Sequence, residues 1–190
     1  MTTIEQFVAQ AANFELTTER LKLRRFKATD LADEMAQQQN LAVMRYIRTP
    51  LSDVEAIANF QDFLKTYQGQ EGEWLAFCVN LNTQPGYIGA VSFRYESLDL
   101  AIVEIGYRFN PNYHGKGYAF EATRALFNFI FTQLNAHKIV AKCDPMNLPS
   151  FKVMEKLGMQ REGLLRQHYK IGEDYCDELV YGLLADEWDQ

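Results

Sequence analysis

The 190-residue chain lacks the features of small secreted domains and of membrane proteins. Its three cysteines, Cys78, Cys143 and Cys176, are odd in number and have no paired metal-ligand spacing, so reduced thiols are expected. No run of 18 apolar residues occurs, which excludes an evident membrane-spanning helix. The N-terminus has no basic start before a long apolar stretch, so it is not typical of a secretory signal. We therefore expect a cytoplasmic protein without a metal.

An excess of positive charge is also absent. Lys and Arg total 19 against 25 Asp and Glu, which gives a formal net charge of −6. Such a chain is a poor candidate for non-specific nucleic-acid binding and favours cationic partners. Apolar residues make up 47% of the chain, which is enough for one core without metals or disulfides. A single domain is therefore expected.

Apolar periodicity indicates a mixed α+β domain over residues 19–190, preceded by an N-terminal extension over residues 1–18. Strands are expected over residues 20–26, 74–81, 87–95, 101–109, 138–143, 159–169 and 175–184. Helices are expected over residues 31–39, 52–67, 118–134 and 148–157. The crossover rule predicts that strand 138–143 lies parallel to strand 101–109.

One expected helix carries a single apolar stripe. The stripe consists of Val54, Ile57, Phe60, Leu64 and Tyr67, which recur at helical spacing. Its aromatic members are expected in the core rather than in a cofactor-binding surface.

The stretch from Glu104 to Leu126 combines a strand, a glycine loop and the start of a helix. Pro111 ends the strand, and Gly115 and Gly117 precede the helical pattern. Glycines allow the backbone to approach a ligand closely, and the first N–H groups of a helix attract negative charge. The stretch therefore predicts a phosphate or pyrophosphate site.

Two common nucleotide-binding motifs do not fit this loop. A P-loop requires Ser or Thr after its Lys, whereas Lys116 is followed by Gly117. The Rossmann motif requires a third glycine, where this chain has Phe120.

The loop does resemble the Q/R-x-x-G-x-G/A motif of GNAT-type N-acetyltransferases, here His114-Gly115-Lys116-Gly117-Tyr118-Ala119. A second stretch, Asn147-x-x-Ser150 followed by Met154-Glu155-Lys156-Leu157-Gly158-Met159, is similar to N-x-x-S-x-x-x-x-E-K-L-G-[FM]. The latter is typical of the branch that contains the ribosomal-protein N-acetyltransferases RimJ and RimL. His114 departs from the usual Gln, Arg or aromatic residue, and we expect its ring to pack at the loop's edge.

The resemblance extends over about residues 21–188. It implies a central, mostly antiparallel sheet of seven strands, splayed between its fourth and fifth strands and flanked by about four helices. It also implies direct acetyl transfer from acetyl-CoA, the cosubstrate, to a primary amine without a metal. The cofactor-binding residues implied are Tyr107, Arg108, Phe109, His114, Gly115, Lys116, Gly117, Tyr118, Ala119 and Asn147.

The resemblance further implies two catalytic residues. Glu104 is the candidate base, and its alternative role is a strand carboxylate paired with a cation. Ser150 is the candidate acid for the thiolate, whereas the alternative is that Asn147 and Ser150 only cap a helix. Tyr169 is a second candidate acid. Cys143 is expected to be an inert buried thiol rather than a nucleophile.

The preferred acceptor is a protein N-terminal amine, which follows from the branch alone. The alternatives are a small amine (polyamine, amino acid or aminoglycoside) and a non-catalytic acyl-CoA-binding module. We expect the acceptor pocket to involve residues 44–67 and the turn at 172–175. No nucleic-acid or membrane partner is expected, and a homodimer is compatible with the sequence but not required by it.

Overall fold

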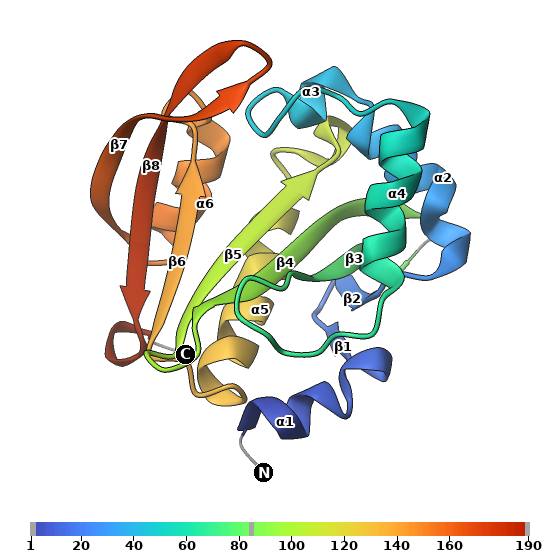
Figure 1. The fold of residues 1–190 in the computed structure, drawn as a ribbon. Coiled ribbons are helices and arrows are strands. Elements are labelled where there is room, and N and C mark those ends of the chain that lie inside the picture. Colours follow the sequence, from blue (N-terminus) through green and yellow to red (C-terminus); the bar gives the residue numbers. More distant parts are fainter. Residues whose placement is uncertain (1–2, 84–85, 189–190) are drawn as a thin grey trace.

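A mixed sheet of eight strands forms the centre of the computed structural model, which describes residues 3–83 and 86–188 (Figure 1). The strand order is β1-β2-β3-β4-β5-β6-β8-β7, and each neighbouring pair is antiparallel except the parallel pair β5 and β6. The strands are β1 Glu15–Thr17, β2 Leu21–Arg25, β3 Leu75–Leu81, β4 Tyr87–Ser97, β5 Ile102–Phe109, β6 Lys138–Cys143, β7 Gln160–Ile171 and β8 Asp174–Leu184. The expected α+β domain and its parallel crossover are confirmed.

The sheet has one strand more than the seven expected. The additional strand is β1, which lies in the N-terminal extension and pairs with β2 at the edge of the sheet. Three residues are too short for an alternating pattern, so the sequence gives no signal for it.

Helices cover both faces of the sheet. The α-helices are α1 Thr3–Val8, α2 Leu31–Gln38, α3 Leu41–Met44, α4 Asp53–Leu64, α5 Tyr118–Thr132 and α6 Leu148–Lys156. The helices α2, α3 and α4 lie on one face, and α5 passes behind the sheet in Figure 1. The four expected helices are α2, α4, α5 and α6, and no helix of the described residues is long and apolar enough to cross a membrane.

The main core lies between α5, α6 and the sheet. The N-terminal extension contributes to it, because the Phe7 ring lies 5.0 Å from that of Phe129 on α5, and Phe14 lies 4.4 Å from the same ring. A smaller core on the opposite face includes Phe26 and Phe60.

The apolar stripe of α4 is only partly buried. The aromatic residues Phe60 and Tyr67 are buried as expected, but the helix ends at Leu64, so Tyr67 lies beyond it. Val54 is 78% exposed, and Ile57 and Leu64 are also exposed. Helix α4 therefore contacts the sheet through a narrower face than the periodicity predicts.

Strands β5 and β6 separate halfway along β5. Their pairing runs from Ile102 opposite Lys138 to Ile105 opposite Ala141. Beyond Ile105, β5 continues along β4 to Phe109 opposite Gly89, whereas β6 continues along β8 (Figure 1). This is the splay that the resemblance implies, and it lies between the two parallel strands.

A buried ionic cluster connects α2 to the outer half of β5. The Glu34 carboxylate is fully buried and accepts hydrogen bonds from Gln38 Nε2 at 2.7 Å and the Tyr87 hydroxyl at 2.6 Å. The Arg108 guanidinium donates to the same carboxylate. Gln38 lies on α2 itself, whereas Tyr87 lies on β4 and Arg108 on β5, so the cluster fixes α2 against these two strands.

We expect Glu34→Leu to lower the free energy of unfolding by about 3 kcal/mol, because it leaves the Arg108 cation without its partner. The matched control is Glu15→Gln, which breaks an exposed ion pair with Lys22 (2.8 Å) and should cost below about 1 kcal/mol. Urea denaturation measures both values. Equal losses of unfolding free energy in the two variants would show that the buried Glu34–Arg108 pair stabilises the protein no more than an exposed ion pair does.

Candidate active site

The glycine loop presents open backbone at the start of α5. Gly115 and Gly117 have φ of +74° and +81°, which is the left-handed region that glycine adopts without strain. A Cβ placed on Gly115 would meet no atom within 4 Å. Gly117 is the N-cap of the 15-residue helix α5 and gives it no side-chain cap. The first N–H groups of α5 are therefore available to an anion.

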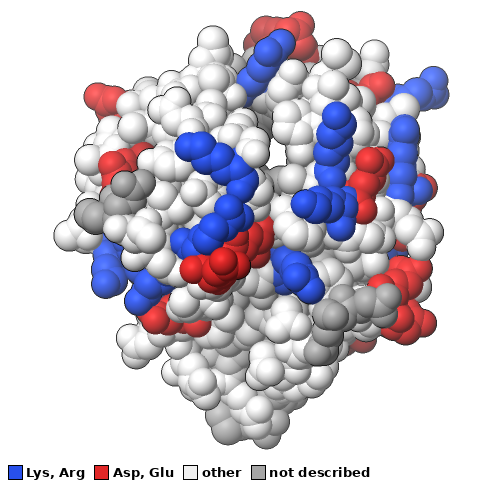
Figure 2. Space-filling model, turned by 180° about the vertical axis from the view of Figure 1, so that it is seen from behind, with Lys and Arg blue, Asp and Glu red and all other residues white. Residues whose placement is uncertain are grey.

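Basic side chains lie near a hollow on the α5 face of the molecule. Figure 2 shows this face from behind, with Lys and Arg on both sides of the hollow and acidic residues among them. Lys116 is exposed, and its ammonium lies 5.5 Å from the centre of the Tyr113 ring. Positive charge is thus available on this face, although the net charge of the chain is negative.

His114 supports the loop from its outer edge. Its Nε2 lies 2.9 Å from the carbonyl oxygen of Phe109, and a carbonyl can only accept, so Nε2 donates. The ring therefore connects the loop to the end of β5. It also occupies the Phe109 carbonyl, which leaves this acceptor less available to a pantetheine arm.

Tyr107 and Arg108 project from opposite faces of β5. The Tyr107 hydroxyl donates to the Ser150 carbonyl at 2.7 Å and accepts from Ser150 Oγ at 3.1 Å. Burial raises the pKa of Tyr107. The Arg108 side chain is committed to Glu34, so Arg108 would meet a cosubstrate through its backbone alone.

Asn147 caps α6 beside the slot between β5 and β6. Its Oδ1 accepts from the Ser150 N–H at 3.3 Å, which is the capping geometry expected from the sequence. Ser150 directs its hydroxyl to Tyr107 instead. The structure thus brings Tyr107, Asn147 and Ser150 together at one side of the slot.

The two remaining nucleophile and acid candidates are held in neutral forms. Burial raises the pKa of the Cys143 thiol to about 11. A thiol in this state is a poor nucleophile, which argues against an acetyl-cysteine intermediate. The Tyr169 hydroxyl donates to Asp144 Oδ2 at 2.9 Å, and burial followed by this carboxylate raises its pKa.

Glu104 lies on the opposite face of β5 from Tyr107 and is only 7% exposed. Arg94 Nη2 is 2.6 Å from Glu104 Oε2, and Lys142 Nζ is 3.5 Å from the same oxygen. These contacts are those of a strand carboxylate paired with cations. The catalytic role of Glu104 stays a prediction.

Sequence reasoning missed Glu178, which belongs to the same charged group. Its carboxylate lies 3.9 Å from His168 Nε2. Burial raises the pKa of Glu178 and the Glu104 charge adds to this, whereas Lys142, His168 and Arg94 oppose it. Glu178 is 74 residues from Glu104 (178 − 104), so only the strand order β5-β6-β8 brings them together.

Trp74 was missed in the same way. A Cβ on Gly106 would lie 3.7 Å from Trp74 Cη2, so the indole covers β5 just where it leaves β6. The Arg94 guanidinium lies 4.7 Å from the centre of the indole ring. The signal available was an aromatic residue next to a strand, which is too common to indicate a site.

The two segments expected at the acceptor pocket approach each other. A Cβ on Gly172, in the β7–β8 turn, would lie 3.6 Å from Thr49 Cγ2 in the segment after α3. Figure 1 shows this hairpin bending towards α3 above the separated strands.

Among the described residues, no group of three His, Cys, Asp or Glu side chains could hold a metal ion.

Comparison with known proteins agrees with this geometry. The family model described as an acetyltransferase (GNAT) domain matches residues 20–160. YnaD of Bacillus subtilis (strain 168), named as an uncharacterized N-acetyltransferase, is 36% identical over 173 residues, or 91% of this chain and 98% of YnaD. The chain belongs to the GNAT acetyltransferase family, whose members use acetyl-CoA as the acetyl donor.

Solved structures share the fold. A GNAT-family acetyltransferase from Bacillus anthracis has a TM-score of 0.79 and 32% identity, covering 91% of this chain and 99% of that one. A spermidine N-acetyltransferase from Vibrio cholerae, in complex with CoA and spermine, has a TM-score of 0.77 at 22% identity, covering 90% and 98%. A ribosomal protein uS5-alanine N-acetyltransferase from Escherichia coli (strain K12) is 27% identical over 44% of this chain and 43% of its own. The two relatives whose names include an acceptor act on different amines, so they do not determine the acceptor of this chain.

We expect Gly115→Ala to raise KM for acetyl-CoA about fivefold, because a left-handed alanine costs about 1 kcal/mol and the loop would relax away from its anion-binding shape. The matched control is Gly163→Ala, a glycine without positive φ whose Cβ would also meet open space. Steady-state kinetics with acetyl-CoA varied measures both. A change in the control as large as that in Gly115→Ala would contradict the loop assignment.

Proposed function

We propose that this chain transfers the acetyl group of acetyl-CoA directly to a single primary amine, with a protein N-terminal amine as its acceptor. The observation that carries the proposal is the separation of β5 and β6 beyond Ile105, beside the Gly115–Gly117 loop. The loop offers N–H groups to the diphosphate, and the slot offers unpaired strand backbone to the pantetheine arm. The thioester would then reach the point where Trp74 covers Gly106.

The charge balance around Glu104 favours one amine over a polyamine. Glu104 is paired with Arg94 and Lys142, and Lys142 also contacts Glu96. Carboxylates whose charge is already balanced by Arg or Lys attract the second and third ammonium groups of a polyamine only weakly. The resemblance to the RimJ and RimL branch supports the same acceptor class.

The chemistry needs three groups, and the described residues supply candidates for each. An N–H group of β5 beyond Ile105 would polarise the thioester carbonyl. Glu104 would take a proton from the attacking amine, directly or through a water molecule. When the C–S bond breaks, Ser150 would protonate the thiolate and regain a proton from solvent water, and its contact with Tyr107 would orient the hydroxyl.

Glu178 would contribute to binding the acceptor. Its carboxylate faces the same side of the sheet as Glu104 and can attract an ammonium group only when it is ionised. Because its pKa is raised, this attraction is complete well above that pKa and is lost as pH falls through it.

We expect KM for the amine to rise as pH falls through the raised pKa of Glu178. Glu178→Gln should raise this KM about tenfold at neutral pH and remove its pH dependence, with KM for acetyl-CoA unchanged. Glu104→Gln should instead lower kcat about 100-fold. Kinetics from pH 5 to 9 separate the two, and an unchanged kcat/KM across pH for Glu104→Gln would remove Glu104 from the mechanism.

An acceptor panel tests the substrate class. Thiol release from acetyl-CoA should be steady with peptides that have a free N-terminus and absent with the same peptides blocked by N-terminal acetylation. Spermidine and aminoglycosides should give rates at least about tenfold lower, since the local charge is compensated. Faster release with spermidine would replace the proposed acceptor by a small amine. Binding of CoA without release on any acceptor would identify a non-catalytic acyl-CoA-binding module.

A further inference from the structure

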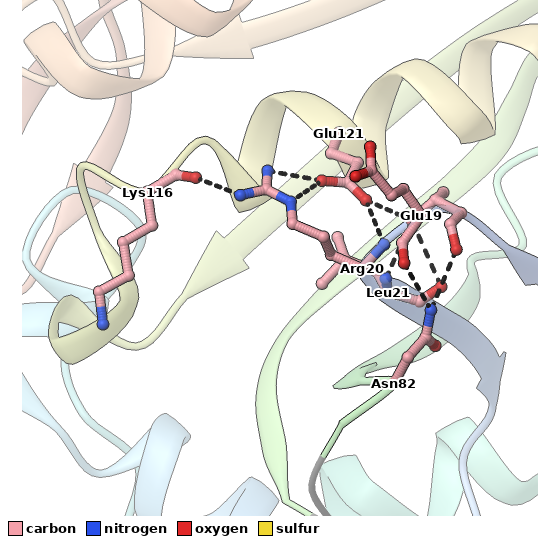
Figure 3. A network of polar contacts seen from close by, with 7 residues as sticks. Glu19, Arg20, Leu21, Asn82, Lys116 and Glu121 are labelled. Carbon is pink, nitrogen blue, oxygen red and sulfur yellow. Dashed lines mark hydrogen bonds and ion pairs between the residues drawn. The ribbon is translucent and has the colours of Figure 1, made fainter.

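Arg20, in the turn between β1 and β2, contacts both ends of the glycine loop–helix junction (Figure 3). Its Nη1 donates to the Lys116 carbonyl at 2.9 Å, and its Nε donates to Glu121 Oε2 at 2.6 Å. Its backbone N–H donates to Glu121 Oε1 at 3.0 Å. The guanidinium also lies 4.7 Å from the centre of the Tyr118 ring. One side chain thus connects the loop, the first turn of α5 and the edge of the sheet.

The first contact fixes the direction of an N–H group. In a planar trans peptide, the C=O and N–H groups point in opposite directions. The Lys116 carbonyl belongs to the same peptide as the Gly117 N–H, so a carbonyl held by Arg20 directs this N–H away from Arg20. Gly117 has no Cβ, so the backbone on its side of this peptide can rotate, and the loop sequence alone does not fix the orientation of the peptide.

The second contact compensates the negative charge of an acidic side chain near the proposed diphosphate site, through an ion pair with Arg20. Glu121 lies in the first turn of α5 and its carboxylate is 17% exposed. Burial would raise its pKa, but hydrogen bonds from Thr18 and from the Arg20 N–H and guanidinium outweigh burial and lower it. Glu121 is thus ionised, and without Arg20 its charge would repel a diphosphate.

The turn that carries Arg20 is itself fixed in place. Asn82, after β3, donates from Nδ2 to the carbonyls of Thr18 at 3.0 Å and Glu19 at 3.2 Å. The Asn82 N–H donates to the Arg20 carbonyl at 2.9 Å (Figure 3). The guanidinium is therefore presented from a rigid base.

We propose that Arg20 is a positioning residue for the acetyl-CoA diphosphate: it orients the Lys116–Gly117 peptide and neutralises Glu121. The inference rests on the proposed role of the Gly115–Gly117 loop. Arg20 is 43% exposed, so its contribution to stability is small and its effect falls on cosubstrate binding.

The test compares Arg20→Met with Lys22→Met. Lys22 has the same exposed fraction, 43%, and forms an ion pair with Glu15 on the same strand pair, away from the loop. Arg20→Met should raise KM for acetyl-CoA and the calorimetric Kd of CoA about tenfold, as expected for lost charge-assisted hydrogen bonds, with kcat within about twofold. Lys22→Met should leave all three unchanged.

A double variant separates the two effects of Arg20. Arg20→Met combined with Glu121→Gln should bind CoA about threefold more tightly than Arg20→Met alone, because no unpaired carboxylate is left at the site. Arg20→Lys keeps the charge but cannot span both acceptors, so its Kd should rise about threefold with an unchanged Tm.

The outcomes are distinct. A Kd within twofold of the parent protein in both Arg20→Met and Arg20→Lys would overturn the inference while leaving the proposed function intact. Failure of the parent protein to bind CoA would overturn the proposed function itself. If Arg20→Met does not fold, Arg20→Lys decides the question by the same Kd criterion.

Discussion

The separation of two parallel strands is the constraint on which the rest of this structure depends. Strands β5 and β6 share only four paired positions before β5 follows β4 and β6 follows β8. A sheet tolerates such an opening only if each half is held by its own neighbours. Here Glu34, Arg108 and Tyr87 hold the outer half of β5 from α2, and Tyr107 reaches across to Ser150 on α6. The slot is thus a supported opening, and backbone groups inside it are left for a ligand.

The glycine loop from His114 to Gly117 has a similar dependence on distant segments. Gly115 and Gly117 provide the left-handed backbone, but they do not determine which way each peptide faces. His114 fixes the loop to the end of β5, and Arg20 fixes the other end to the turn before β2. The conformation of a local motif therefore depends on a contact between residues that are 96 positions apart in the chain.

The sequence was sufficient for seven of the eight strands, for the four longest helices, for the parallel crossover and for the position of the glycine loop, because these depend on local periodicity, glycine and proline chemistry, and a specific family motif. It was not sufficient for Arg20, Glu178 or Trp74, whose meaning depends on register between strands far apart in the chain. The apolar stripe of α4 shows that periodicity also does not determine how much of a helix is buried. Periodicity identified the helix, but Val54 and Leu64 are exposed because tertiary packing decides how much of an apolar face is covered.

Tyr107 and Glu104 lie three positions apart on one strand and face opposite sides of the sheet. The sheet is therefore a partition, with the glycine loop and α5 on one side and the charged group of Glu104 and Glu178 on the other. With the sites that we propose, acetyl-CoA and the amine would enter from opposite sides, and both would be bound before the acetyl group moves. The direct transfer that we propose therefore implies a ternary complex and sequential kinetics, in which no acylated form of the protein has to persist between two half-reactions.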